Sequence, residues 1–168
     1  MESELLVRRP TRKDVATIAR VHVESWRETY RGLMSDGVLD DPDLVRHRER
    51  FWSEALTNPL YAQNRIAVAE LDGSLVGVAM AGPALDPGGE TTDQLYLIYT
   101  LATVHGRGAG ASLLEAVLDP HACTGLWVAD PNPRAQAFYR RHGFVGGKTK
   151  VEDGLREVWM TRPPTVRG

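Results

Sequence analysis

A glycine-rich run in the second half of the sequence has the residue types needed to hold a phosphate group. It reads His105-Gly106-Arg107-Gly108-Ala109-Gly110, between a strand predicted over Gln94–Leu101 and a helix predicted over Ala111–Leu118. Glycine tolerates positive φ and leaves room for a ligand to approach the backbone. The N–H groups at the start of a helix attract anions, assisted by the helix dipole. The run therefore predicts a pyrophosphate site, to which Arg107 adds a positive charge.

A second segment places an amide and two aromatic rings on one predicted helix. Asn132 stands at the start of this helix, where its side chain caps the backbone or bonds a ligand. Tyr139 follows Ala135 by one helical turn, so Tyr139 and Phe138 face inward together. Taken alone, this arrangement describes a tyrosine in the core as well as one in a site.

The glycine run also satisfies a dinucleotide-binding pattern when it is taken literally. Gly106, Gly108 and Ala111 have the required spacing, and Asp130 follows about twenty residues later. However, Thr103–His105 separates the strand from the first glycine, whereas the dinucleotide turn follows its strand directly. The chain also offers too few alternating units for a doubly wound sheet, which disfavours this alternative.

Together the two segments resemble motifs of the GCN5-related N-acetyltransferase (GNAT) family. The pyrophosphate loop of that family, Gln/Arg-x-x-Gly-x-Gly/Ala, is matched by the run from His105 to Gly110. Its second motif, Asn-x-x-Ala-x-x-Phe-Tyr-x-x-x-Gly-Phe, is matched without insertion by Asn132, Ala135, Phe138, Tyr139, Gly143 and Phe144. The resemblance covers nearly all of the chain. Two departures are His105, where Gln or Arg is usual, and Ala102, where a proline is common.

The resemblance implies that acetyl-coenzyme A is the co-substrate and that no metal is needed. Tyr139 would protonate the departing thiolate, which is reasonable because a thiol has a lower pKa than a phenol. A backbone N–H near Leu101 would stabilise the oxyanion of the reacting thioester. The residues implied in binding the coenzyme are Tyr99, Thr100, Leu101, His105, Gly106, Arg107, Gly108, Ala109, Gly110, Asn132, Ala135 and Phe138.

The amine acceptor is less well defined by the sequence. The helix that borders the acceptor pocket in the family carries Trp26 and Tyr30 here, and Trp26 equally fits the apolar stripe of that helix. His22 lies on the same stripe and is interpreted as a buried core imidazole. The acidic stretch Asp36–Asp43 is interpreted as a solvated loop, with attraction of a cationic acceptor as the alternative.

The general base is left open among four carboxylates and a water relay. The carboxylates are chosen by approximate position only: Glu24, Glu28, Glu90 and Asp93.

Composition excludes several classes of protein. The net charge of −2 disfavours nucleic-acid binding, and no apolar run reaches the ~20 residues of a membrane span. The single cysteine, Cys123, cannot form an internal disulfide, and the acidic N-terminus lacks the features of a signal peptide. The five histidines show no metal-ligand spacing. We therefore expect a cytoplasmic protein with a small-molecule partner; homodimers are common in the family, but no residue here requires one.

The predicted fold is a single α/β domain over residues 1–168, with a core of about 4–161 and a tail over 162–168. A mixed, mostly antiparallel sheet of six or seven strands is expected with about four helices. Two hairpins are predicted, at Asp72-Gly73 and at Asp153-Gly154, because Asp-Gly between strands favours tight turns.

The sequence thus predicts an acetyl-CoA-dependent N-acetyltransferase that moves an acetyl group to a primary amine by direct attack in a ternary complex. Two alternatives stay open: a protein N-terminal acetyltransferase and a non-catalytic acyl-CoA-binding module.

Overall fold

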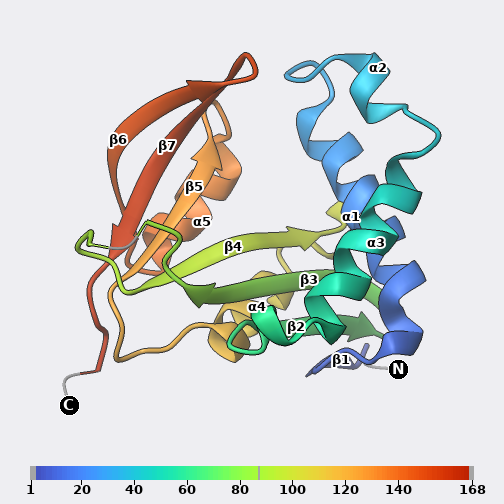
Figure 1. Ribbon diagram of the computed structural model, residues 1–168, viewed down its shortest axis with the longest axis horizontal. Coiled ribbons are helices and arrows are strands. Elements are labelled where there is room, and N and C mark those ends of the chain that lie inside the picture. Colours follow the sequence, from blue (N-terminus) through green and yellow to red (C-terminus); the bar gives the residue numbers. More distant parts are fainter. Residues whose placement is uncertain (1–2, 87, 167–168) are drawn as a thin grey trace. The chain divides into compact units, whose positions relative to one another are not determined.

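The computed structural model describes residues 3–86 and 88–166, and these build one seven-stranded sheet with the order β1-β2-β3-β4-β5-β7-β6. Its strands are β1 (Leu5–Arg8), β2 (Arg65–Leu71), β3 (Ser74–Pro83), β4 (Asp93–Thr100), β5 (Thr124–Ala129), β6 (Val145–Glu152) and β7 (Leu155–Arg162). The longer helices are α1 (Val15–Tyr30), α3 (Leu44–Thr57), α4 (Ala109–Val117) and α5 (Pro133–Arg141). The β4–β5 pair is parallel, and the pairs β1–β2, β2–β3, β5–β7 and β6–β7 are antiparallel. The predicted fold class is confirmed (Figure 1).

The chain divides into two compact units. The first comprises the described parts of Met1–Ala81 and Leu97–Val117, and the second those of Gly82–Tyr96 and Leu118–Gly168. Strand β4 contributes to both, because its first half lies in the second unit and its last residues lie in the first.

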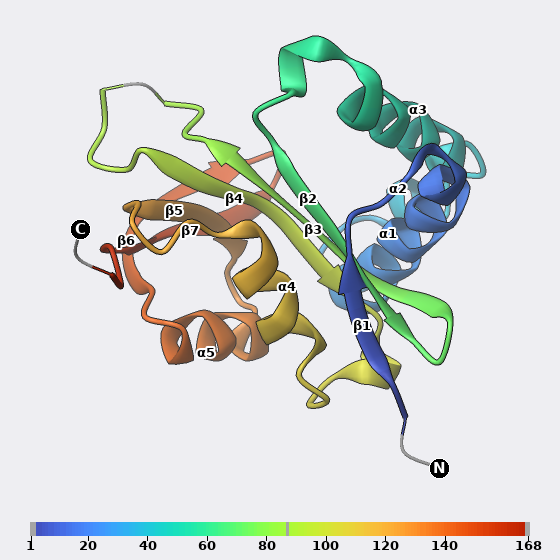
Figure 2. The ribbon, with the colours of Figure 1, turned by 90° about the horizontal axis from the view of Figure 1, so that it is seen from below.

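In the first unit, helices cover both faces of the strands. Helices α1 and α3 pack together on one face, and α4 lies against β1 and β2 on the other (Figure 2). Successive side chains of β4 point to opposite faces of the sheet. The Tyr99 ring stacks on His22 of α1 on one face. The methyl group of Thr100 lies on the other face, beside Gly77 and Leu113 of α4. The core of this unit is formed by Ile18, Leu39, Trp52, Val68, Val78 and Leu113, all fully buried.

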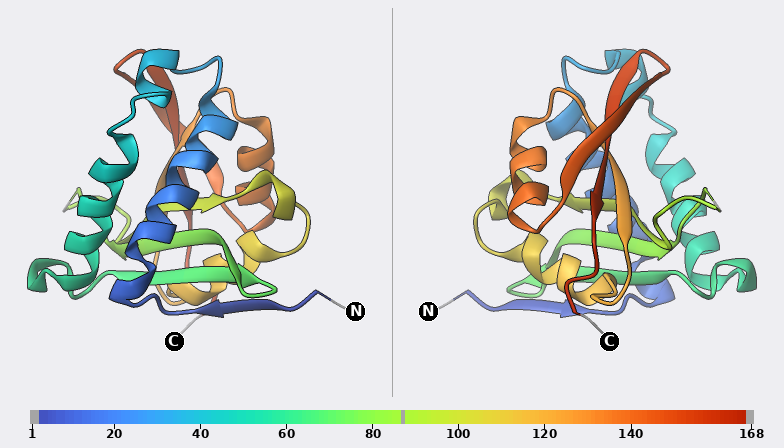
Figure 3. Two further views of the ribbon diagram at one scale, coloured as in Figure 1. Left: turned by 90° about the vertical axis from the view of Figure 1, so that its right-hand side faces the viewer. Right: turned by 90° about the vertical axis from the view of Figure 1, so that its left-hand side faces the viewer.

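The second unit is built from the start of β4, the hairpin of β6 and β7 beside β5, and α5. The right-hand view of Figure 3 shows the twist of this hairpin. Leu126, Phe144 and Met160 form its buried centre. Gly125 allows the Trp159 indole to lie directly over β5, since an added Cβ would come within 2.1 Å of that ring.

Both predicted hairpin turns are confirmed by their backbone angles. Asp72 and Gly73 have φ of 51° and 84°, and Asp153 and Gly154 have φ of 51° and 78°. Two successive positive values are typical of the turn that suits the twist of antiparallel strands.

Three details of the chain differ from the sequence-based expectation. Helix α4 begins at Ala109, two residues earlier than predicted, so Gly110 is helical. The acidic stretch contains a short helix, α2 (Asp36–Leu39), capped by the Ser35 side chain, rather than only loop. Strand β7 extends one residue into the expected tail, to Arg162, and the N–H groups of Thr165 and Val166 both donate to the Pro120 carbonyl.

Candidate functional site

The glycine run forms a tight turn that leads from β4 into α4. A short 3₁₀ helix, η3 (Ala102–Val104), follows the strand, and the Arg107 N–H donates to the Val104 carbonyl at 3.1 Å. Ser112 makes the first helical bond of α4, to the Gly108 carbonyl at 3.0 Å. The N–H groups at 109–111 thus open the helix without a partner one turn back, which is the arrangement that attracts an anion. Because the Arg107 N–H is already bonded within the turn, fewer backbone N–H groups of the glycine run are available to an anion than the sequence alone indicated.

Two glycines of the run are needed for its conformation. Gly106 and Gly108 have φ of 80° and 84°, which L side chains rarely adopt. An ideal Cβ at either position meets no heavy atom within 4 Å. The turn is therefore open on its outer side, and it fits a pyrophosphate group approaching the backbone.

His105, the departure from the family pattern, ties the turn back to the strand. Its Nε2 lies 3.2 Å from the Thr100 carbonyl oxygen, and the side chain is exposed. The histidine thus supports the loop without occupying the N–H groups of α4.

The oxyanion donor predicted near Leu101, at the end of β4, is not the N–H of Leu101 itself. The Leu101 N–H donates to the Val76 carbonyl of β3 at 2.9 Å, so it is not available to an oxyanion. Backbone groups alternate along a strand, and the backbone of the preceding residue, Thr100, therefore faces the other edge of β4. On that edge, among the described residues, β4 pairs with β5 at Asp93 and Gln94.

The four candidate bases differ in environment. Glu28 is engaged, because its Oε1 accepts the Ala102 N–H at 3.1 Å. Glu24 and Glu90 are exposed, and Asp93 is buried at the start of β4 in the second unit. The contacts and burial of these four carboxylates do not single out one of them as the general base.

An aromatic cluster joins α1, α3 and β4 within the first unit. His22 is 2% exposed and its Nδ1 accepts the Trp52 indole N–H at 3.1 Å. The imidazole stacks on Tyr99, with ring centroids 4.5 Å apart, and meets Trp26 edge-on at 5.5 Å. Burial, followed by the charge of Arg48, lowers the pKa of His22 to about 3. His22 is therefore neutral near pH 7 and, since Nδ1 is the acceptor, carries its proton on Nε2.

Trp26 and Tyr30, the predicted pocket residues, belong to this cluster. Their rings meet edge-on at 5.9 Å, and both side chains are half-buried. Trp26 thus serves the packing of α1 and still reaches the surface, consistent with both interpretations of the sequence.

Sequence reasoning missed Arg48, the cation of this cluster. Its guanidinium carbon lies 4.6 Å from the centre of the Trp26 ring and 5.7 Å from that of Phe51. Burial lowers the pKa of Arg48, although an arginine stays protonated. The spacing could have found it, because Arg48 precedes the core residue Trp52 by four positions and so shares its helix face.

In the second unit, the second motif forms α5 as expected. The Asn132 side chain caps this helix by accepting the Ala135 N–H at 3.4 Å. Tyr139 is buried at 8% exposure, between the rings of Phe138 and Phe144 at 5.5 and 5.9 Å. The inward orientation predicted for Tyr139 is therefore confirmed, and its chemical role stays a prediction.

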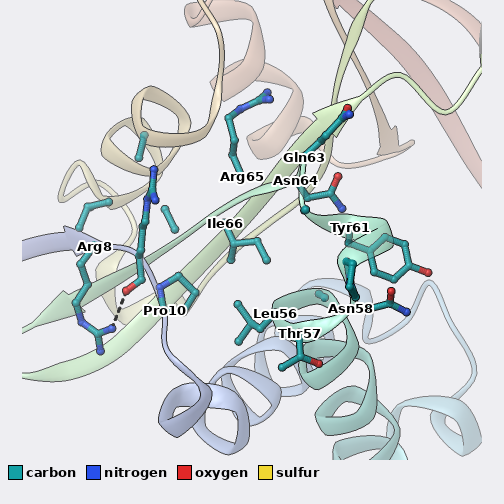
Figure 4. Close-up of a pocket in the computed structure, with 17 residues that line it drawn as sticks. Arg8, Pro10, Leu56, Thr57, Asn58, Tyr61, Gln63, Asn64, Arg65 and Ile66 are labelled. Carbon is teal, nitrogen blue, oxygen red and sulfur yellow. Dashed lines mark hydrogen bonds between the residues drawn. The ribbon is translucent and has the colours of Figure 1, made fainter.

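A pocket of about 660 Å³ lies elsewhere in the first unit, where β1, the end of α3 and β2 meet (Figure 4). It includes none of the predicted site residues. Two of its arginines are already engaged, because Arg8 pairs with Asp14 and Glu70, and Arg65 donates to the Val117 carbonyl. We therefore do not assign the chemistry to it.

The part of the chain that the structure describes shows neither a metal-binding cluster nor a membrane-spanning helix. No group of three or more His, Cys, Asp or Glu residues is arranged to hold a metal ion there. Nor does that part contain a helix with the length and apolar character needed to span a membrane.

Comparison with known proteins identifies a family, sequence relatives and a solved structure that this chain resembles over most of its length. The model of the Acetyltransferase (GNAT) family matches residues 19–144. The uncharacterized N-acetyltransferase YuaI of Bacillus subtilis is 30% identical over 141 residues, which are 81% of this chain and 78% of YuaI. The probable N-acetyltransferase Rv2775 of Mycobacterium tuberculosis is 25% identical over 151 residues, 88% of this chain and 84% of that protein. The PaiA N-acetyltransferase of Thermoplasma acidophilum, solved in complex with coenzyme A, has the same fold, with a TM-score of 0.71, 20% identity, and coverage of 95% and 99% of the two chains.

Proposed function

The chain belongs to the GNAT family of acetyltransferases, and from this premise we propose that it transfers the acetyl group of acetyl-CoA to a primary amine of a small molecule. The observation that carries the proposal is the open glycine turn at the start of α4, with positive φ at Gly106 and Gly108. The coenzyme complex of the PaiA N-acetyltransferase supports an acyl-CoA as donor.

The proposed reaction needs no covalent intermediate on the protein. The neutral amine nitrogen attacks the thioester carbonyl carbon, a C–N bond forms and the C–S bond breaks. The amine loses a proton to a base or to water, and the thiolate of coenzyme A gains one. The N–H groups at 109–111 and the Arg107 side chain hold the pyrophosphate, which fixes the thioester relative to the chain.

Two further residues have proposed roles by the family resemblance. The Thr100 N–H, on the edge of β4 that faces away from β3, aligns the pantetheine arm, since the Thr100 carbonyl oxygen already lies 3.2 Å from His105 Nε2. The Tyr139 hydroxyl donates the proton to the leaving thiolate, because phenol has the higher pKa of the two groups and is protonated at neutral pH.

The test is titration of the purified protein with acetyl-CoA in a calorimeter, with NAD as the parallel ligand. Gly108→Ala and Gly73→Ala form a matched pair, since both glycines have φ of 84° and an open Cβ direction. Both variants should lose similar stability, about 1 kcal/mol. Only Gly108→Ala should weaken acetyl-CoA binding, by about tenfold, because its methyl group adds bulk to the turn assigned to the pyrophosphate.

Gly108→Asp extends the test by adding a negative charge at the same place. Its affinity for acetyl-CoA should fall further than that of Gly108→Ala. An affinity equal to that of the unmodified protein would overturn the pyrophosphate assignment, and binding of NAD without acetyl-CoA would revive the dinucleotide alternative.

The acceptor class is then tested with acetyl transfer to small amines and to peptides with free N-termini. Transfer to peptides alone would favour the protein N-terminal acetyltransferase. Tight acetyl-CoA binding without transfer to any amine would favour the binding module.

A further inference from the structure

The cluster between α1, α3 and β4 contains buried hydrogen-bond donors that have no partner among the described residues. Three buried nitrogens in it have no hydrogen-bond partner: His22 Nε2, Trp26 Nε1 and Arg48 Nε. Each of them is a donor, given that His22 carries its proton on Nε2. Buried donors are usually paired, so three together in one cluster indicate that an acceptor group belongs there.

Arg48 is also a cation without a counter-ion. Among the described residues no carboxylate is paired with it, and no carboxylate contributes to the shift of its pKa. Of its three guanidinium nitrogens only Nε is both buried and unpartnered, which leaves Nη1 and Nη2 on the accessible edge. A half-buried guanidinium held against two aromatic rings presents this edge in a fixed orientation.

The nearest acidic stretch along the chain does not supply the missing charge. Asp36 and Asp40 both pair with Arg31, at 2.9 and 2.8 Å, and Asp43 lies 3.9 Å from Arg46. Asp36, Asp40 and Asp43 thus lie against Arg31 and Arg46, and none of them is paired with Arg48.

We propose that Arg48 binds a carboxylate carried by the acceptor amine, so that the substrate is an amino acid or a similar amino-carboxylate. This inference rests on the proposed acetyl transfer. A carboxylate matches the guanidinium edge with two parallel hydrogen bonds. One cation among neutral donors balances a single negative charge, which favours a carboxylate over a phosphate monoester.

The position of the cluster supports this assignment. Tyr99 stacks on His22 and meets Trp26 at 6.5 Å, and it stands next to Thr100 on β4. An acceptor anchored at Arg48 would thus lie beside the strand to which the reacting thioester arm is assigned, with its amine directed along β4.

The first experiment measures acetyl transfer to amines offered in matched pairs, each as the free carboxylate and as its carboxamide: glycine, β-alanine and alanyl-alanine. Phosphoethanolamine is a further arm. The carboxylate should be preferred in kcat/KM by tenfold or more for at least one pair, which is the range of a charge-assisted bidentate bond. Equal use of every pair, or preference for phosphoethanolamine, overturns the inference while leaving the proposed function intact.

Variants of Arg48 and Arg50, both on α3, test whether Arg48 causes the preference for carboxylates. Arg48→Met keeps the apolar stem and should abolish the discrimination by raising KM, with the affinity for acetyl-CoA unchanged. Arg48→Lys should restore part of it, because lysine keeps the charge but loses the fork. Arg50→Met removes an exposed charge from the same helix and should keep the full preference. Loss of discrimination in Arg50→Met as well would contradict a specific contact with Arg48.

A second readout does not depend on turnover. Benzoate added to ¹⁵N-labelled protein should shift the indole N–H signal of Trp26, and benzamide should not; Arg48→Met should remove the shift. A benzoate shift without transfer to any amine would uphold the carboxylate site and reject the proposed reaction. Absence of a shift together with equal use of the matched pairs would reject the site.

Discussion

The carboxylate of Glu28 accepts the backbone N–H of Ala102 at 3.1 Å, linking α1 to the start of η3 across 74 positions of the sequence. In the family that the chain resembles, a proline is common at the position of Ala102 and has no N–H to donate. Here the alanine supplies a donor and Glu28 pairs with it. The glycine turn that follows is thereby attached to the helix that carries the aromatic cluster.

Single and double replacements of Glu28 and Ala102 measure how much their hydrogen bond contributes to the free energy of unfolding. Ala102→Pro should fold, because Ala102 is the first residue of η3 and Leu101 has the extended ψ of 146° that precedes a proline. Glu28→Ala should cost about 1 kcal/mol of unfolding free energy in the unmodified chain and near zero in the Ala102→Pro background. Urea unfolding of the four proteins gives the coupling, and equal costs in both backgrounds would show that the bond contributes nothing.

Much of the arrangement follows from local chemistry that the sequence displays. The turns at Asp72-Gly73 and Asp153-Gly154 were predicted because only a few residue types tolerate positive φ. Tyr139 was predicted to face inward from its spacing to Ala135, and it does. These features depend on residues that are close in sequence.

The features that the sequence did not predict depend on contacts between distant segments. An oxyanion donor was predicted near Leu101, but the bond of the Leu101 N–H to the Val76 carbonyl is known only once β3 and β4 are paired. Arg48 lies in a strongly charged run, which is typical of a solvated face, and its guanidinium meets the Trp26 ring only once α3 packs on α1. A charge pattern alone cannot reveal a missing counter-ion.

Tyr139→Phe tests the proposed proton donor. Loss of the hydroxyl should lower kcat by about tenfold to a hundredfold, the lower part of the range for general acid catalysis, since a thiolate is already a fair leaving group. The affinity for acetyl-CoA should stay within about twofold, because the ring remains between Phe138 and Phe144.

Steady-state kinetics at saturating substrates check this expectation, with Tyr61→Phe, a half-exposed tyrosine outside both motifs, as control. If Tyr139→Phe turns over like the unmodified protein, Tyr139 is a core residue and has no part in the chemistry.

Gly125→Ala should destabilise the second unit strongly. The new methyl group would lie 2.1 Å from the Trp159 ring, which cannot move without disturbing its packing on Trp127 at 5.0 Å. We expect a loss of about 2–3 kcal/mol from overpacking. Gly146→Ala is the matched control, because its Cβ would meet Val158 at an ordinary 3.8 Å. Thermal unfolding of both variants measures the difference in stability. Similar melting temperatures would mean that the Trp159 indole moves aside without cost.

His22 should make the stability of the protein depend on pH below neutrality. Burial, followed by the charge of Arg48, keeps the folded-state pKa of His22 at about 3, below the ordinary value of 6.5. Between these values the unfolded chain binds a proton that the folded chain does not, so stability is complete above pH 6.5 and is lost as the pH falls toward 3. At pH 4.5 the loss from this one residue is about 3 kcal/mol.

His22→Asn isolates that contribution, because the amide oxygen can accept the Trp52 N–H in place of Nδ1 and does not titrate. The variant should be less stable at pH 7.5, since the smaller side chain leaves space in the cluster. Its unfolding free energy should nevertheless fall less steeply than that of the unmodified protein between pH 6.5 and 4.5, a window above the pKa of about 2 that the Arg8 partner gives Asp14. Urea titrations at pH 7.5, 6.5, 5.5 and 4.5 measure the two slopes. Parallel slopes would mean that His22 takes up its proton without leaving the folded state, and that the imidazole is accessible enough to act as a base.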